Sequence, residues 1–338
     1  MKEVLVTGGG GYIGSTLIRL LLERGYKVKV LDRFFFGLDS IKDIKDKVQI
    51  IKDDIRFVRE DVFKDVYAVL DLAALSNDPT GEIDPQKTLD INFLGRVRVA
   101  LLAKRAGVKR YVLASSCSVY GFQNDILFED SPVNPLTTYA EANYLAEQSI
   151  IPFSSDKFVV TVLRQATVYG FSYRMRFDLA INAMVLSMFK TKKLKVMRDG
   201  QQWRPFVHVK DTSKAFITVL ESDADKVNGQ IFNVGSNEQN IKIIDLAKKV
   251  ADTLGIPLNI EWYGDPDKRS YRVNFDKIKN VLGYKPDHSF EDGIKEVYRA
   301  LAEGKISDDD KTRTVVWYRN LIKWKEILDD VLYKGEIL

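Results

Sequence analysis

The sequence has very few of the side chains from which disulfides and metal sites are built. Its 338 residues include a single cysteine, Cys117, and two histidines, His208 and His288. One cysteine excludes an internal disulfide and is too few for a zinc cage. The two histidines lie far apart in the sequence, which argues against a histidine-based metal site. We therefore predict no bound metal.

The chain also lacks a long hydrophobic run, a signal-peptide pattern and a block of basic residues. No apolar stretch approaches the roughly 18 residues that span a bilayer, and residues 1–6 lead directly into a glycine-rich loop. The net charge is +4, with 45% hydrophobic and 29% charged residues. These values are typical of a globular protein and disfavour partners such as nucleic acid or a membrane. We expect a reducing, cytoplasmic compartment.

The first half of the sequence alternates short apolar runs with helical periodicities. Apolar residues recur every three to four positions over 13–24 and 88–106, which predicts helices. Strand–helix alternation indicates a parallel sheet with helices on both faces, so we predict a Rossmann-type doubly wound α/β fold. Ligands of such sheets bind at the carboxyl ends of the strands. The runs predicted as buried strands are 3–8, 27–32, 48–54, 68–74, 110–116 and 159–165.

After about residue 170 the alternation becomes irregular, and we predict a smaller mixed α/β domain. Its expected elements are a β-hairpin around Asp199 and Gly200 followed by a strand, a helix over 243–255 that Gly255 ends, and a strand over 258–264. Apolar residues at three- and four-residue spacings over 311–333 predict a helix that packs on its own domain or on a partner subunit. The expected divisions are a nucleotide-binding domain over 1–169 plus roughly 203–235, a substrate domain over 170–202 and 236–300, and a helical extension over 301–338.

The segment VTGGGGYIGS, residues 6–15, places glycines between a predicted strand and a predicted helix. Gly8 permits a tight turn, Gly11 lets the backbone approach a pyrophosphate, and Gly14 allows close packing of helix on strand. The helix N-terminus then offers N–H groups and a positive dipole end to the phosphates. Asp32, at the end of the second strand, suits the hydroxyls of an adenosine ribose and repels a 2′-phosphate. We predict NAD(H), and Arg33 beside Asp32 keeps NADP(H) as the alternative.

The spacing Gly-x-x-Gly-x-x-Gly resembles that of the extended short-chain dehydrogenase/reductase family, whose members are mostly nucleotide-sugar epimerases, dehydratases and reductases. Further matching segments are DDIR (53–56), DLAALS (71–76), DINFLG (90–95), SSCSVYG (115–121) and TYAEAN (138–143). In the fourth-strand segment Asp71 stands where a histidine is common. The cofactor-binding residues that the resemblance implies are Gly8, Gly11, Tyr12, Ile13, Gly14, Asp32, Arg33, Asp54, Ile55, Leu72, Ala73, Ala74, Asn92, Ser115 and Tyr139.

The same resemblance places the chemistry at Ser116 and Tyr139. In the family, hydride transfer between a sugar carbon and the nicotinamide is coupled to proton transfer through the tyrosine, and a lysine four residues later assists. Here that lysine is replaced by Asn143. A tyrosine of ordinary pKa, near 10, carries about one phenolate in a thousand molecules at pH 7. We see no Lys or Arg within two turns after Tyr139, so we expect Asn143 to reduce turnover more than ligand binding.

The residues beside Ser116 separate the sub-reactions of the family. Family 4,6-dehydratases carry a carboxylate directly after the catalytic Thr, whereas this chain has Cys117 and Ser118. Dehydration is therefore disfavoured, and we interpret Cys117 as a buried packing residue. The resemblance implies a nucleotide-diphosphate sugar as substrate, with weaker contacts expected from Arg174 and Arg176. The implied substrate-binding residues are Ser76, Ser116, Ser118, Thr167, Asn182, Arg204 and Arg269.

The leading hypothesis is an NAD-dependent nucleotide-sugar epimerase that acts at C4 through a transient keto-sugar. A nucleotide-sugar ketoreductase or oxidoreductase is the alternative enzyme. A catalytically weak protein that binds NAD and a sugar nucleotide is the alternative that Asn143 suggests. The resemblance also implies a homodimer formed through the helices at 88–106 and 139–149.

Overall fold

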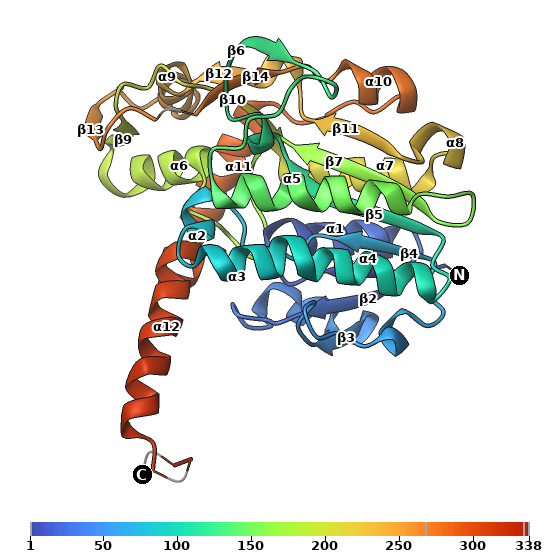
Figure 1. The fold of residues 1–338 in the computed structure, drawn as a ribbon. Helices are drawn as coiled ribbons and strands as arrows, with labels where there is room; N and C mark the ends of the chain where they lie inside the picture. Colours follow the sequence, from blue (N-terminus) through green and yellow to red (C-terminus); the bar gives the residue numbers. More distant parts are fainter. Residues whose placement is uncertain (1, 268, 334, 337–338) are drawn as a thin grey trace.

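The computed structural model describes residues 2–267, 269–333 and 335–336, and its centre is a parallel sheet of seven strands (Figure 1). The strand order is β11-β7-β5-β4-β1-β2-β3, with every neighbouring pair parallel. This order reverses direction beside β1, as in Rossmann folds, so the predicted fold class is confirmed. The strands are β1 Glu3–Thr7, β2 Lys27–Asp32, β3 Gln49–Lys52, β4 Ala68–Asp71, β5 Arg110–Ser116, β7 Val159–Gln165 and β11 Gln230–Val234.

Side chains alternate between the two faces of this sheet. From β1, Val4 and Val6 join a core with α1 and α7, whereas Leu5 joins a second core with α4 and α5 on the opposite face. α4 and α5 lie side by side in Figure 1. The helices around the sheet are α1 Tyr12–Glu23, α2 Asp78–Gly81, α3 Pro85–Leu89, α4 Arg96–Arg105, α5 Thr138–Ile150, α7 Val209–Glu221 and α8 Ala224–Val227.

The predicted helix over 88–106 is interrupted by one irregular segment. Residues Asp90–Gly95 form a π-helix between α3 and α4. Such widened turns occur most often beside functional sites. Here the π-helix directs Asn92 and then Arg96, one turn later, towards the protein interior, where both side chains are buried.

The remaining elements form a smaller mixed region at the carboxyl ends of the main strands. Its third core cluster is built from α6, α9 and α11. The parallel pair β6–β14 joins this region to the segment that follows Ser116. Its strands are β6 Phe122–Leu127, β8 Thr167–Tyr169, β9 Leu194–Met197, β10 Trp203–His208, β12 Asn240–Lys242, β13 Ile260–Tyr263 and β14 Ser270–Val273, and its helices are α6 Ala180–Thr191, α9 Ile243–Leu254, α10 Asp276–Leu282 and α11 Phe290–Ala302.

The predicted β-hairpin around Asp199 and Gly200 is wrong. β9 pairs in parallel with β13, while β10 pairs with β8 and β12. Leu194 and Val196 of β9 and Phe206 of β10 all pack in the core of the small region. β10 also reaches the core of the main sheet through Val207, and it belongs to a different sheet from β9. β11, which closes the main sheet, was absent from the predicted strands.

The last helix, α12 Thr314–Val331, contacts the body through its first turns and then extends beyond it (Figure 1). Within the described part of the chain, none of the helices has the length and apolar character needed to cross a bilayer.

Candidate active site

A cavity of about 660 Å³ lies where the main strands end and the smaller region begins. The sheet delivers the ends of β1, β2, β4, β5 and β7 to its wall, as expected for this topology. The predicted residues that line the cavity are Gly8, Gly11, Tyr12, Ile13, Gly14, Asp32, Arg33, Asp54, Ile55, Leu72, Ala73, Ala74, Ser76, Ser115, Ser116, Ser118, Tyr139, Thr167, Arg204 and Arg269. Three predicted residues, Asn92, Asn143 and Asn182, lie behind this wall.

The glycine loop leaves room only for backbone at its tightest points. Gly8 has φ +66°, and a Cβ there would lie 2.9 Å from the backbone of Ala73. A Cβ on Gly14 would collide with the carbonyl oxygen of Gly8. α1 then begins at Tyr12 without a side-chain cap, so N–H groups of its first turn remain available at the cavity. This loop fits the pyrophosphate of a dinucleotide.

Asp32 is held in position by the loop that it faces. Its carboxylate accepts hydrogen bonds from the backbone N–H groups of Gly10 at 2.9 Å and Phe34 at 2.6 Å. Burial raises the pKa of Asp32. Arg33 donates to Asp54 at 2.7 Å, so its guanidinium is engaged away from Asp32. The arrangement favours a ribose with free hydroxyls, hence NAD, over a 2′-phosphate.

Tyr139, at the start of α5, faces Ser116, at the end of β5. Both side chains line the cavity, and Ser116 Oγ accepts a hydrogen bond from the N–H of Ser118 at 3.1 Å. Burial raises the pKa of Tyr139, while the positive charge of Arg96 acts to lower it. Asp78 acts to raise the pKa, and Ser116 and Arg176 act to lower it. The pair therefore has the geometry of a proton-transfer site whose charge balance is set by its neighbours.

Arg96 is the residue beside Tyr139 that sequence reasoning missed. It lines the cavity with only 1% of its surface exposed, and its Nη1 donates to Asn143 Oδ1 at 2.8 Å. Its Nη2 donates to the carbonyl oxygen of Ala114 at 2.7 Å. The periodicity of this helical segment could have identified it. Positions 92, 96, 99, 100 and 103 form the buried side of the segment, where an arginine is unusual.

Asn92 and Asn182 are fully buried and bond the backbone. Asn92 accepts from the N–H of Leu75 at 2.8 Å and donates to its carbonyl at 3.0 Å, which fixes the segment after β4. Asn182 accepts from the N–H of Gly170 and donates to the Tyr12 hydroxyl, each at 3.0 Å. Neither side chain lines the cavity, so direct contact of Asn92 or Asn182 with a ligand stays a prediction. Their observed hydrogen bonds hold other parts of the protein in place.

Two arginines converge at the end of the cavity formed by the small region. Arg204 and Arg269 both bond the carboxylate of Asp267, at 2.8 Å and 2.7 Å, and Arg269 also pairs with Asp78. Paired planar guanidinium groups suit phosphate oxygens, which they contact bidentately. The two aspartates were not anticipated from the sequence, and they hold both guanidinium groups in place.

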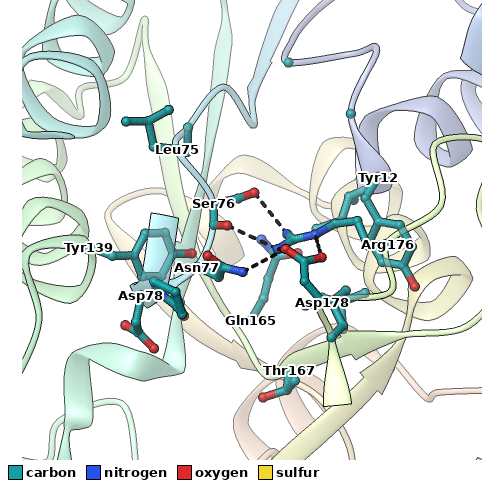
Figure 2. Close-up of a pocket in the computed structure, with 18 of the residues that line it drawn as sticks. Tyr12, Leu75, Ser76, Asn77, Asp78, Tyr139, Gln165, Thr167, Arg176 and Asp178 are labelled. Carbon is teal, nitrogen blue, oxygen red and sulfur yellow. Dashed lines mark hydrogen bonds and ion pairs between the residues drawn. The ribbon is translucent and has the colours of Figure 1, made fainter. Parts of the chain in front are cut away.

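Across the cavity from Tyr139 lies a second arginine–aspartate pair (Figure 2). Arg176 bonds Asp178 at 2.9 Å and the Ser76 hydroxyl at 3.0 Å. Figure 2 shows Ser76 and Asn77 between this pair and Tyr139. Arg174 stacks its guanidinium on the ring of Phe36 at 3.6 Å. Arg176 is therefore more central to the cavity than the sequence indicated.

Cys117 is buried, as predicted. Its thiol contacts the carbonyl oxygen of Arg164 at 3.3 Å, and burial raises its pKa. It does not line the cavity. A protonated, enclosed thiol packs as a small apolar group and is not a reactive one.

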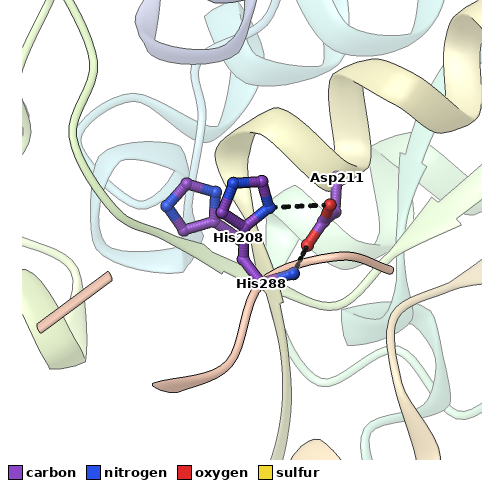
Figure 3. Close-up of side chains that lie close together, drawn as sticks. All are labelled: His208, Asp211 and His288. Carbon is purple, nitrogen blue, oxygen red and sulfur yellow. Dashed lines mark hydrogen bonds and ion pairs between the residues drawn. The ribbon is translucent and has the colours of Figure 1, made fainter. Parts of the chain in front are cut away.

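Outside the cavity, the fold brings the two histidines together although they are far apart in sequence (Figure 3). The rings of His208 and His288 stack with centroids 4.2 Å apart, and Asp211 lies beside them. Both ring nitrogens of His208 and both oxygens of Asp211 already take part in hydrogen bonds with Lys210, Glu296 and the segment before α11. We interpret the cluster as a link between α7 and that segment.

Comparison with known proteins agrees with this geometry. Residues 4–235 match the model of the NAD-dependent epimerase/dehydratase family. The chain is 32% identical to a putative UDP-glucose 4-epimerase of Methanocaldococcus jannaschii, covering 87% of this chain and 96% of that one. It is 30% identical to a UDP-glucose 4-epimerase of Lactobacillus helveticus, covering 86% and 94%. The solved structure of MoeE5 with UDP-glucuronic acid and NAD superposes with a TM-score of 0.79 at 26% identity, covering 89% and 99%. The chain therefore belongs to the NAD-dependent epimerase/dehydratase family.

Proposed function

We propose that this protein is an NAD-dependent UDP-sugar epimerase that inverts C4 through a transient 4-keto sugar. The observation that carries the proposal is the pair of Ser116 and Tyr139 on the wall of one cavity that also contains the glycine loop and the paired arginines. The positions after Ser116 hold Cys117 and Ser118, so the carboxylate that dehydration needs is missing there. The family and the names of the relatives support the same reaction and a uridine nucleotide.

In this proposal each part of the cavity has one task. NAD, when bound, supplies the carbon that accepts and returns a hydride. Tyr139 takes the proton of the C4 hydroxyl and later gives it back, and the Ser116 hydroxyl beside it on the cavity wall helps to share that proton. Arg204 and Arg269 hold the diphosphate, so that the sugar reaches Tyr139 from the small region. The glycine loop and Asp32 hold the cofactor on the other side.

Incubation with UDP-glucose, UDP-N-acetylglucosamine and UDP-glucuronate, followed by ¹H NMR, tests the reaction. We expect the C4 epimer of at least one of these sugars, without net consumption of NAD(H). Deuterium placed at C4 stays at C4, because the same hydride returns. A ketoreductase instead consumes NADH in proportion to product. Absence of any epimer and of any reduced NAD with all three sugars would contradict the proposal.

Tyr139→Phe removes the hydroxyl that transfers the proton and leaves the ring in place. We expect kcat to fall by about 10²–10⁴-fold. The affinities for NAD and UDP, measured by calorimetry, stay within about threefold because the ring remains in the cavity wall. A fall in affinity as large as the fall in kcat would indicate that Tyr139 binds ligand and does not transfer the proton.

We further propose a homodimer in a reducing, cytoplasmic compartment. Leu94 and Leu101 are 53% and 44% exposed on the π-helix and α4. Two leucines two turns apart give an apolar stripe that a second copy could cover. The single buried thiol is compatible with a reducing compartment.

A further inference from the structure

The surroundings of Arg96 differ from those of an arginine in a structural ion pair. Its guanidinium is buried between α4, α5 and the end of β5, with the Asn143 amide oxygen and the Ala114 carbonyl as acceptors. Among the described residues, the acceptors of its guanidinium are these two neutral oxygens and no carboxylate, and its Nε has no hydrogen-bond partner. Burying an uncompensated cation is costly, so a position that keeps one calls for a functional explanation.

Asn143 is the residue that holds this cation. Its amide Nδ2 donates to the carbonyl oxygen of Tyr139 at 2.8 Å, which turns Oδ1 towards Arg96 Nη1. Asn143 therefore connects the backbone of Tyr139 to the guanidinium. A lysine in its place would bring a second positive charge against Arg96 and would remove the acceptor that orients it.

We propose that Arg96 supplies Tyr139 with the positive charge that a lysine at position 143 would otherwise provide, with Asn143 as its holder. The site thus contains its cation, contributed by α4 and not by α5. Resting on the proposed epimerase function, the inference makes Arg96 a positioning residue that acts through Tyr139. It replaces the expectation that Asn143 leaves the tyrosine without a cation.

The groups that face Tyr139 from its neighbouring elements act on its ionisation in opposite directions. Arg96 on α4 and Arg176 before α6 favour the phenolate, as does the hydroxyl of Ser116 on β5. Asp78 on α2 disfavours it, and burial disfavours it most. Arg176 is already paired with Asp178, and Asp78 with Arg269. Arg96 is the member of this set without a salt-bridge partner in the described chain, so its removal has the largest expected effect.

The test measures the ionisation of Tyr139 directly. Full-length protein carrying ¹³Cζ-tyrosine is titrated by NMR, and the Tyr139 signal is identified by its absence from Tyr139→Phe. We expect Arg96→Met to raise the pKa of Tyr139, because the charge of Arg96 acts to lower it. The expected rise is about one unit, at the lower end of the shifts that a nearby opposite charge produces. The pH profile of kcat moves to higher pH by the same amount, and kcat at pH 7 falls by about tenfold.

Three further variants separate charge from structure. Arg98→Met removes another cation from α4. The Nη2 of Arg98 donates to the Val58 carbonyl at 3.0 Å, and we expect its removal to leave the pKa of Tyr139 unchanged. Arg96→Lys keeps the charge and most of the effect. The double variant Arg96→Met/Asn143→Lys returns a cation to the α5 position, and we expect it to recover the titration and the profile of the parent. Thermal unfolding of each variant confirms that it is folded.

Asn143→Lys alone gives an independent answer if Arg96→Met fails to fold. We expect a lower Tm and no gain in turnover, because two cations then meet in a buried site. A rise in turnover of tenfold or more at unchanged stability would overturn the proposal, as would an unmoved Tyr139 titration in folded Arg96→Met. Because the titration needs no turnover, a failed substrate panel would count against the epimerase function alone.

Discussion

Asp54 shows how one buried carboxylate in the cavity wall is kept ionised. Burial acts to raise its pKa, but hydrogen bonds and ion pairs with Arg56 and then Arg33 outweigh burial and lower the pKa to about 2. Its side chain is only 9% exposed. Since an aspartate in an unfolded chain has a pKa near 3.9, the folded state binds this proton more weakly, and ionisation of Asp54 stabilises the fold above that value.

We expect Asp54→Asn to lower the free energy of unfolding by about 2 kcal/mol at pH 7. The depressed pKa means that this contribution is lost as pH falls through the folded pKa, so the difference from the parent shrinks to roughly half at pH 3. Urea unfolding at both pH values measures it. Asp61→Asn is the control, because the Arg59–Asp61 pair is largely exposed and contributes little. A pH-independent difference would show that the ion pairs do not account for the effect.

At the residue scale, the sequence predicted those cavity residues that stand at a fixed spacing from a strand. The glycines, Asp32, Ser116 and Tyr139 stand at fixed offsets from predicted strands, and the structure places all of them around the cavity. Arg96 could not be found in that way, because it is paired with Asn143 across two helices, 47 residues apart. The pairing of Arg204 with Asp267 and of Arg269 with Asp78 was missed for the same reason, since 63 and 191 residues separate the partners.

At the scale of elements, α12 fixes the loop that follows β2. The indole N–H of Trp317 donates to the carbonyl oxygen of Phe35 at 2.7 Å. Tyr318 packs edge-on against Phe35 and Phe36, with ring centroids 5.5 and 5.4 Å apart, and it lines the cavity. α12 therefore contributes to the wall of a cavity whose first lining residue is Gly8.

We expect Trp317→Ala to weaken NAD binding by about tenfold, since it removes a partly buried hydrogen bond that orders the loop beside Asp32. UDP binding, which uses the opposite end of the cavity, stays within about twofold. Calorimetry with each ligand measures both. Ile327→Ala is the matched control: it removes an apolar side chain of the same helix that is 48% exposed, and we expect no change in NAD affinity. Equal losses in the two variants would show that α12 acts only through overall stability.

The elements themselves were predictable where their burial pattern is periodic. The bounds predicted for 27–32, 110–116 and 159–165 agree with β2, β5 and β7, and Gly255 ends α9 with a left-handed conformation. The hairpin failed because an Asp-Gly pair marks a turn but does not choose a partner strand. The strands share the core of the small region through Leu194, Val196 and Phe206, but Val207 of β10 is also buried in the core of the main sheet, a contact that β9 does not make.

At the scale of the whole molecule, the proposed homodimer depends on the exposed apolar stripe formed by Leu94 and Leu101. We expect Leu94→Asp/Leu101→Asp to raise the dimer dissociation constant by at least about a hundredfold, because two buried leucines per subunit would be replaced by charges. Sedimentation velocity at micromolar concentration measures this. Leu258→Asp, at a leucine with similar exposure (45%) in the small region, is expected to leave the dimer intact. A monomeric parent protein at these concentrations would contradict the dimer.

The hydrogen bond between Arg96 and Asn143 predicts how these two positions vary among relatives. With a lysine at 143, an arginine at 96 meets a like charge in a buried space, and with an asparagine at 143 and no arginine at 96 the tyrosine has no cation. Each single exchange is therefore disfavoured, while the double exchange is tolerated. Among the relatives of this protein, arginine at 96 and lysine at 143 should rarely occur together, and the two positions should change as a pair.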